Sequence, residues 1–451
     1  MEIPRAWVPR GYPPSASFSM SFRQNALLLA VLTALIAIAG AWSNDSTLAG
    51  AWRLPLALLL LGLAYEGWMT TRSRLSLRMK SGQRGVLGRP DTLQLAVTHQ
   101  LNRAAMVELA PDAPAEIEVD STVQVLVVPA GAAAQTQLRV TPRRLGDYQW
   151  PNVRARVAGP LGLAWWTQRL AADFRLQVVP EMMRADSRGL GGGRGGARAA
   201  PVAGAGAEVL QLRDYQAGDP QHLIDWKAVA RSGRLVSRDF SEDQHLEIVI
   251  AIDAGRGSAL RAGDLDRLGH YSNVAARFAE HAVAQDDRVG LVIFADRPLA
   301  ALAPGRGMAT VLRIRHMLTA ARLAATESNP LNAALRIRSL VRHRSLIVML
   351  TDLDDATVAG QLASAARLLL PKHLPLIAGL SSPQAEALSH APARAWLDPY
   401  ESLAAQEYCM RLQRNVAALR ALGAPAVLAS PDQLERAVFD AYAEFRQRRR
   451  V

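Results

Sequence analysis

Carboxylates follow two of the apolar runs in the C-terminal half of the chain. Asp253 ends the run that begins at Leu246, and Asp352 ends the run that begins at Ser345. If these runs are parallel strands, their carboxyl ends meet at one edge of a sheet, where ligands gather. Carboxylates at such an edge need a cation, an arginine or a shared proton. The candidate metal ligands are Asp253, Ser258, Thr310 and Asp352, with Thr351 as a second threonine.

The loop after Asp253 argues against a bound metal. It reads DAGRGS, so Gly255 and Gly257 bring no hydroxyl oxygen. Water would have to complete the octahedral shell that Mg²⁺ requires. Arg256 or backbone amides could neutralise Asp253 instead. We therefore expect a structural carboxylate and no cofactor, with Mg²⁺ at a degenerate site as the alternative.

A second stretch whose residue types could form a functional site is 212–240, LRDYQAGDPQHLIDWKAVARSGRLVSRDF. The Gly218-Asp219-Pro220 triplet predicts a turn, and 223–230 has the length of a short helix. Opposite charges so close together predict internal pairs, while tryptophan and arginine are typical of interface hot spots. We expect an Arg/Asp lock that ties the preceding segment to the large domain, with an exposed rim that docks a partner. The residues are Arg213, Asp214, Tyr215, Gly218, Asp219, Asp225, Trp226, Lys227, Arg231 and Arg234.

The same stretch satisfies the spacing of some metal-dependent nucleases or hydrolases. Asp219 precedes Asp225, and Lys227 follows two residues later. In such sites two carboxylates hold Mg²⁺ and a lysine steadies the attacking water. The arrangement requires paired strands, whereas this segment predicts a turn and a helix. The sequence shows no Ser/His/Asp, Cys/His or Walker pattern, and its single cysteine is Cys409. We expect no catalytic residues, with the hydrolase as the alternative.

The elements that would position these residues fall into separate regions. Apolar branched runs alternate with helical patterns in 208–451, which predicts a mostly parallel sheet covered by helices. Period-two alternation in 71–185 predicts an antiparallel sandwich of immunoglobulin-like kind. The Gly-rich stretch 186–207 predicts a flexible linker. The expected strands of the α/β region are 246–253, 289–296, 345–352, 374–380 and 424–428.

Two apolar runs near the N-terminus predict a transmembrane hairpin over 25–70. They cover 26–42 and about 50–69, each close to the ~20 residues that cross a bilayer. Arg53 and Glu66 lie near the ends of the second run, where they could reach lipid headgroups. Arginines flank the hairpin on both sides, which predicts that segment 1–24 and the later domains remain in the cytoplasm. A cleaved signal peptide is the alternative, and the second run argues against it.

The chain is strongly basic, with a net charge of +12. Such a balance indicates nucleic acid or an anionic membrane face as a partner. For a chain held at a membrane, the lipid surface suffices. We therefore expect the bilayer as a partner and no specific nucleic acid.

On the phrase 212–240 the chain resembles the domain of unknown function 58 family. Its members are bacterial and membrane-anchored, carry a von Willebrand A-like domain, and are often encoded beside MoxR-type AAA+ ATPases. The resemblance implies a scaffold at the inner membrane, with two spans and cytoplasmic domains. Its α/β domain would bind a MoxR-type ATPase in the assembly or maturation of envelope or metal-dependent complexes.

The resemblance also marks two departures. Von Willebrand A domains hold a divalent metal through Asp-x-Ser-x-Ser, a distant threonine and a further aspartate, whereas this chain has glycines at both serine places. In the family, an aromatic strand leads to an Asp-Pro-Leu-Gly-Leu turn. Here the segment from Gly146 has Gly159 at the aspartate, so the capping role of that carboxylate is absent.

Overall fold

The computed structural model describes residues 21–42, 50–72, 75–80, 84–121, 123–182, 203–241 and 245–448. They form two compact units, each with its own core. The first takes the chain up to Glu181 together with Gly263–Gly269 and Leu318–Arg322. The second takes the remainder. The chain is therefore multidomain, as its pattern predicts.

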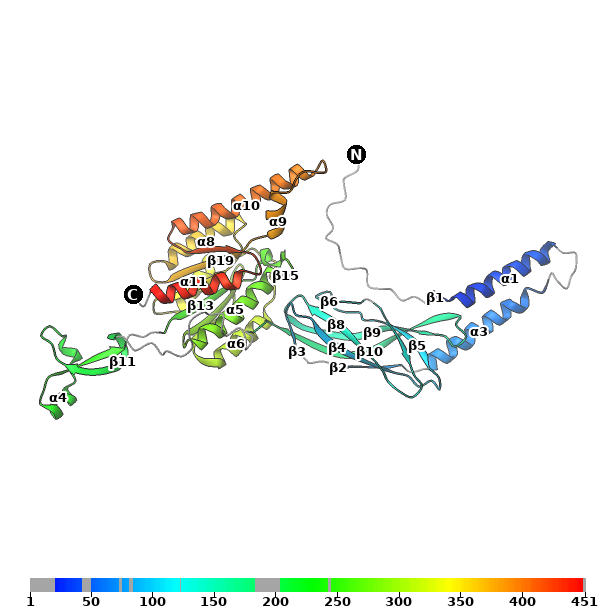
Figure 1. Cartoon of the computed structure of the whole chain (residues 1–451), viewed down its shortest axis with the longest axis horizontal. Helices are drawn as coiled ribbons and strands as arrows, with labels where there is room; N and C mark the ends of the chain where they lie inside the picture. The colour runs from blue at the N-terminus through cyan, green and yellow to red at the C-terminus, as the bar shows by residue number, and fades with distance from the viewer. Residues whose placement is uncertain are drawn as a thin grey trace. The chain divides into compact units, whose positions relative to one another are not determined.

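Two helices begin the first unit (Figure 1). Helix α1 (Gln24–Trp42) contacts helix α3 (Arg53–Arg72). Among the described helices, α1 alone combines the length and apolar composition of a membrane span. The two bounds lie within a few residues of the predicted runs. Helix α3 differs from α1 because it carries charge within its length.

The charge within α3 is Glu66, which is fully buried. Its Oε1 accepts hydrogen bonds from the N–H groups of Leu161 (2.7 Å) and Leu163 (3.1 Å). Its Oε2 accepts from the Ala164 N–H (3.0 Å) and the Trp166 indole N–H (3.4 Å). The expectation that Glu66 reaches lipid headgroups is therefore wrong. A carboxylate near the end of an apolar run looks like an interfacial residue, but here it accepts hydrogen bonds from a turn of the sandwich.

This contact explains the glycine at position 159. A Cβ atom at Gly159 would lie 2.1 Å from the Glu66 carboxylate. The turn between strands β9 (Gly146–Ala158) and β10 (Ala164–Val179) thus receives its capping carboxylate from α3 rather than from its own first residue. The capping role that seemed lost with Gly159 is filled by Glu66.

Two sheets pack face to face as the predicted sandwich, since one core cluster draws on both. One sheet has six strands in the order β1-β10-β9-β5-β7, with β3 pairing β10, and the other has four in the order β2-β4-β8-β6. Alternate residues of β4 are buried, which is why period-two patterning found it. The remaining bounds are β1 Ser21–Phe22, β2 Ser76–Lys80, β3 Arg84–Val86, β4 Asp91–Thr98, β5 Ala105–Ala110, β6 Ile117–Val119, β7 Gln124–Val128 and β8 Ala134–Pro142.

The second unit contains a six-stranded sheet in the order β17-β16-β13-β18-β19-β20. All neighbours are parallel except β17, which pairs antiparallel with β16. The predicted mostly parallel sheet is therefore confirmed, and the edge strand β17 is an addition. The strands are β13 Glu247–Asp253, β16 Arg288–Phe294, β17 Pro298–Gly305, β18 Ser345–Leu350, β19 Leu374–Leu380 and β20 Ala426–Ala429.

Helices cover this sheet (Figure 1). Side chains of α7, α8 and α10 share one core cluster with the strands, while α5 and α11 meet through Phe278 and Tyr442. Short elements η3 (Arg256–Ala259), β14 (Arg261–Ala262) and β15 (Leu265–Asp266) follow β13. The helices are α5 Arg267–Ala284, α6 Gly307–Ala320, α7 Pro330–Leu340, α8 Ala356–Leu369, α9 Pro383–Ser389, α10 Asp398–Ala421 and α11 Leu434–Arg448.

The charged stretch folds as a two-stranded hairpin with a helical insert. Strand β11 (Ala203–Asp214) pairs antiparallel with β12 (Val236–Ser241), and η2 (Gln221–Leu223) and α4 (Trp226–Ser232) lie between them. Because β11 begins at Ala203, the last residues of the predicted linker belong to a strand. The rest of that linker, 186–202, lies outside the described residues.

Candidate functional site

The hairpin of β11 and β12 is closed by a bidentate ion pair. The Arg213 guanidinium donates two hydrogen bonds of 2.8 Å, one to each carboxylate oxygen of Asp219. Asp219 also accepts from the Gln216 N–H (3.0 Å) and the Ser237 hydroxyl (3.2 Å). The hydrogen bonds from Arg213 hold the pKa of Asp219 down at about 2. Gly218 has φ of +112°, a left-handed conformation that the tight turn requires and that glycine adopts without strain.

A second carboxylate begins the inserted helix. Asp225 is the N-cap of α4 and accepts from the N–H groups of Lys227 (3.0 Å) and Ala228 (3.1 Å). The Arg238 Nε–H donates to its other oxygen at 3.0 Å. That hydrogen bond is the main reason why the pKa of Asp225 is lowered. Gly233, with φ of +66°, ends the helix. The short helix predicted over 223–230 is therefore present, but it begins three residues later and ends two residues later.

These pairs revise the predicted lock. Arg213 with Asp219 and Arg238 with Asp225 join residues of the hairpin to each other. Sequence separations of 6 and 13 residues make both pairs local. The lock therefore closes the hairpin on itself, and these two ion pairs do not tie it to the α/β sheet.

Several side chains of the hairpin remain exposed. Trp226 is 64% exposed, and Lys227, Arg231 and Arg234 are exposed as well. Within the described part of the chain, none of these three cations makes an ion pair or a side-chain hydrogen bond. We call Trp226, Lys227, Arg231 and Arg234 the basic surface. It combines an aromatic ring and unpaired cations, the composition of interface hot spots.

Asp219, Asp225 and Lys227 have the sequence spacing of some metal-dependent nucleases, but they do not lie on the paired strands that such a site requires. Asp219 lies in a turn, and Asp225 and Lys227 lie at the start of a helix rather than on paired strands. Each carboxylate already accepts hydrogen bonds from an arginine and from backbone amides. These hydrogen bonds hold the hairpin together and occupy the carboxylate oxygens that a metal ion would need.

At the edge of the large sheet, Asp253 is almost fully buried. Its Oδ1 accepts from the Gly255 N–H (2.8 Å) and from the Ser328 hydroxyl. Its Oδ2 accepts from the Thr351 hydroxyl (2.7 Å). Burial raises the pKa of Asp253, and these hydrogen bonds oppose that shift. Asp253 is therefore held by hydrogen bonds from one backbone amide and two hydroxyl groups.

The two glycines of the loop make room for these partners. A Cβ at Gly255 would lie 2.1 Å from the Ser328 Oγ, and one at Gly257 would lie 2.6 Å from the Asp352 Oδ2. Any larger residue would push the Ser328 hydroxyl away from Asp253. The hydroxyl that a serine at 255 would have carried is thus supplied from a distant loop.

Of the other candidate ligands, the structure brings Asp352 to this loop, since its backbone N–H donates to Asp253 and its Oδ2 lies beside Gly257. The Asp352 Oδ1 accepts from the Tyr271 hydroxyl at 2.9 Å, and the buried hydroxyl of Ser258 has no hydrogen-bond partner among the described residues. Thr310 donates to the Arg306 carbonyl at 3.0 Å, at the start of α6. Arg256 pairs with Glu327, so it does not neutralise Asp253.

A magnesium ion at Asp253 would compete with these donors. Both oxygens of Asp253 already accept hydrogen bonds, so Mg²⁺ would have to displace Ser328 or Thr351. Nor do the described residues contain a group of three or more His, Cys, Asp or Glu side chains that could hold a metal. Ser328 escaped prediction. The one sequence feature that could have drawn attention to Ser328 is its place just before Asn329, the N-cap of α7.

Part of the chain is similar to a known protein family. Residues 211–400 match the family model described as Protein of unknown function DUF58. No curated protein matches the chain significantly. The match includes the end of β11, the rest of the hairpin and most of the α/β sheet.

Three solved structures are distantly similar to the chain. The conserved hypothetical protein BatB from Bacteroides thetaiotaomicron is 14% identical, with a TM-score of 0.31, covering 44% of this chain and 98% of that one. The CARDB domain of the PF1109 protein from Pyrococcus furiosus is 11% identical, with a TM-score of 0.18, covering 24% and 96%. Proximal thread matrix protein 1 from the mussel byssus is 13% identical, with a TM-score of 0.26, covering 44% of each chain. Scores this low add nothing to the fold assignment.

Proposed function

We propose that the chain, whose residues 211–400 match the DUF58 family model, is a non-enzymatic, membrane-anchored scaffold or adaptor. One observation supports this proposal above the others. The hairpin pairs Asp219 and Asp225 internally, yet leaves Trp226 and three cations of the basic surface exposed. Side chains that stabilise only their own fold would not require this exposure. We propose that the basic surface docks a protein.

The finer parts of the proposal rest on the family resemblance. The α/β sheet would be a von Willebrand A-like domain, and the docked protein a MoxR-type AAA+ ATPase that acts in the assembly or maturation of envelope or metal-dependent complexes. Helices α1 and α3 would form a hairpin in the bacterial inner membrane, with the other domains in the cytoplasm. In α3 the membrane part would end near Tyr65, because Glu66 is buried in the sandwich.

The competing proposal is a metal-dependent hydrolase or nuclease that uses Asp219, Asp225 and Lys227. No contact of these residues favours it, since both carboxylates accept hydrogen bonds from arginines. A substitution of one exposed residue nevertheless distinguishes the hydrolase proposal from the docking proposal. Lys227→Ala would abolish hydrolysis that depends on Lys227, and it leaves the cap of α4 intact because only the backbone N–H of Lys227 donates to Asp225.

We expect Trp226→Ala with Arg231→Ala to lower the capture of a MoxR-type ATPase by at least about tenfold, because hot-spot aromatic and arginine side chains often contribute 2 kcal/mol or more each. The measurement is affinity capture of the full chain from detergent-extracted membranes, with the ATPase quantified by mass spectrometry. Asp225 is unsuitable for this test because its loss removes the cap of α4.

Gln216→Ala is the matched control, since Gln216 is exposed on the same hairpin and its hydrogen bonds to Asp219 use only backbone groups of Gln216. Its capture should equal that of the unaltered chain. Equal recovery from the double variant would reject the basic surface as the docking site. Absence of any ATPase from the unaltered chain would reject the partner, and Mg²⁺-dependent hydrolysis lost in Lys227→Ala would favour the enzyme.

A further inference from the structure

The turn between β9 and β10, residues 159–164, packs against the apolar part of α3. A Cβ atom at Gly62 would lie 2.6 Å from the Leu163 Cδ1 and 3.4 Å from the Leu161 Cδ1, so both leucine side chains lie against the helix there. Gly62 precedes Glu66 by four residues, which is about 6 Å along a helix. The tip of the turn therefore extends beyond Glu66, alongside the apolar run of α3 that would lie in the membrane.

The turn also contacts the start of α1, the candidate membrane span. The side-chain amide of Asn25 donates to the Leu161 carbonyl at 3.2 Å, and the Arg23 N–H donates to the Leu163 carbonyl at 2.7 Å. The exposed leucines of α1 begin at Leu27, two residues after Asn25. The turn therefore adjoins the apolar surface that α1 would present to lipid.

Every backbone N–H group of this turn has a hydrogen-bond acceptor within the protein. Glu66 accepts from three of them, those of Leu161, Leu163 and Ala164. The Gly159 N–H donates to the Ala164 carbonyl at 2.9 Å, the Gly162 N–H donates to the Gly159 carbonyl at 3.1 Å, and Pro160 has no N–H. A turn in water does not need such complete pairing, because water accepts from exposed N–H groups. In hydrocarbon no water is available, and an unpaired N–H is strongly unfavourable.

The side chains around the tip are apolar and exposed. Leu161 is 49% exposed. Phe22, on the strand that pairs with β10, is 55% exposed and lies opposite Ala164. Exposed apolar side chains beside a backbone whose N–H groups are all paired are what insertion into a bilayer requires of a turn.

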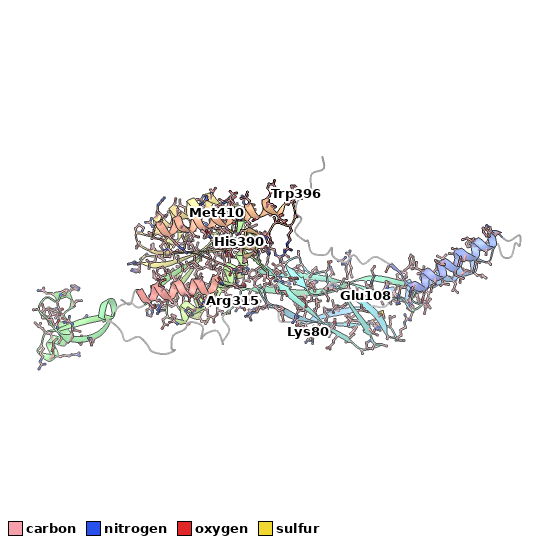
Figure 2. All side chains as sticks on the ribbon, turned by 45° about the horizontal axis from the view of Figure 1, so that its top comes forward. Lys80, Glu108, Arg315, His390, Trp396 and Met410 are labelled. Carbon is pink, nitrogen blue, oxygen red and sulfur yellow. The ribbon has the colours of Figure 1, made fainter. Side chains whose placement is uncertain are left out.

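An aromatic and polar layer follows the tip. The guanidinium groups of Arg23 and Arg156 lie 5.1 and 4.9 Å from the centre of the Trp165 ring. Arg156 also pairs with Glu108, which lies on the sandwich toward α1 and α3 (Figure 2). Tryptophan is typical of the headgroup level of a bilayer, where the long arginine side chain can reach lipid phosphates. The layer does not depend on an excess of positive charge, because Arg156 has its own carboxylate.

We propose that the β9–β10 turn inserts into the bilayer beside α1 and α3, with Leu161 among the acyl chains and Trp165 among the headgroups. The partner of this surface is the lipid itself. The inference rests on the membrane anchor of the proposed function and adds a lipid contact outside the two helices. It also gives the Glu66 carboxylate a purpose, since that group pairs the N–H groups that lipid could not. The inserted turn would hold the sandwich against the membrane surface.

Depth measurements on the full chain in lipid vesicles test this proposal. Cys409 is the single cysteine, so Cys409→Ala gives a background in which one new cysteine carries a nitroxide label. Leu161→Cys labels the turn, Leu28→Cys labels the exposed side of α1, and Asp147→Cys labels an exposed position at the other end of β9. We expect collisions with oxygen to exceed those with a water-soluble nickel complex at positions 161 and 28. The order should be reversed at position 147.

The controls separate the inserted turn from the membrane anchor. An excess of nickel collisions at position 28 would reject the anchor and the inserted turn together. An excess of oxygen at position 28, with position 161 behaving like position 147, would overturn the inserted turn alone. Thermal unfolding shows whether each labelled chain is folded. Should the label at position 161 prevent folding, Phe22→Cys repeats the measurement from the neighbouring strand with the same expected result.

Discussion

Glu66→Ala should destabilise the first unit by about 3 kcal/mol or more, because it leaves three backbone N–H groups and the Trp166 indole without their acceptor. Gly159→Asp should also destabilise the unaltered chain. Its Cβ would collide with the Glu66 carboxylate, and its charge would repel that carboxylate.

When Glu66→Ala is already present, Gly159→Asp should stabilise the first unit instead of destabilising it. With the Glu66 carboxylate removed, an aspartate at 159 has room and can accept the Leu161 N–H as an Asx turn does. The double variant should therefore be more stable than either single variant. Thermal unfolding of the full chain in detergent measures all three, as a double-mutant cycle.

Asp147→Ala serves as the control, since Asp147 is exposed on β9. It should change stability by no more than about 0.5 kcal/mol. A double variant that is less stable than Glu66→Ala alone would show that the two positions do not share one capping role.

Asp253→Ala should destabilise the α/β domain by about 2–4 kcal/mol, because the hydroxyls of Ser328 and Thr351 and the Gly255 N–H lose their buried acceptor. Asp253→Asn should cost much less. The amide keeps one acceptor oxygen and the volume of the side chain, and the two hydroxyl groups can rotate.

The asparagine variant should also change the pH dependence of stability. Burial raises the pKa of Asp253, so the folded state keeps a proton that the unfolded state has lost. Stability from this group is then present below the unfolded value of about 3.9 and falls as pH rises toward the folded value. Asp253→Asn removes this loss of stability with rising pH, because asparagine does not titrate. Relative to the unaltered chain, it should gain stability as pH rises through this window.

Chemical unfolding at a series of pH values, with and without Mg²⁺, checks this prediction. Asp432→Ala is the control, since Asp432 is exposed in the same unit. Stabilisation of the unaltered chain by Mg²⁺ that Asp253→Asn abolishes would contradict the account, because it would mean an ionised carboxylate on a metal.

Local patterns explain which features the sequence could predict. Strands β13, β18 and β19 are buried on both faces, so their continuous apolar runs are unmistakable. The pairs of Asp219 and Asp225 lie within 13 residues, and their charges were visible in one stretch. Strand β17 is at an edge and only partly buried, so its pattern is weak.

Contacts between distant parts of the chain were not predictable. Ser328 reaches Asp253 across 75 residues, and Glu66 reaches the sandwich turn across 95 or more. Neither residue belongs to a charge cluster or a periodic pattern that names its partner. In the sequence, Gly159 and Gly255 alone pointed to these contacts, since each glycine leaves room for a side chain from a distant part of the chain.

Site-specific photo-crosslinking in native membranes tests the central claim most directly. A photoreactive residue at Trp226 lies on the basic surface, and one at Asp147 lies on the sandwich. We expect a covalent adduct with a MoxR-type ATPase from position 226 and none from position 147. A position 226 that yields no more protein adduct than position 147, or that links only to nucleic acid, would contradict it.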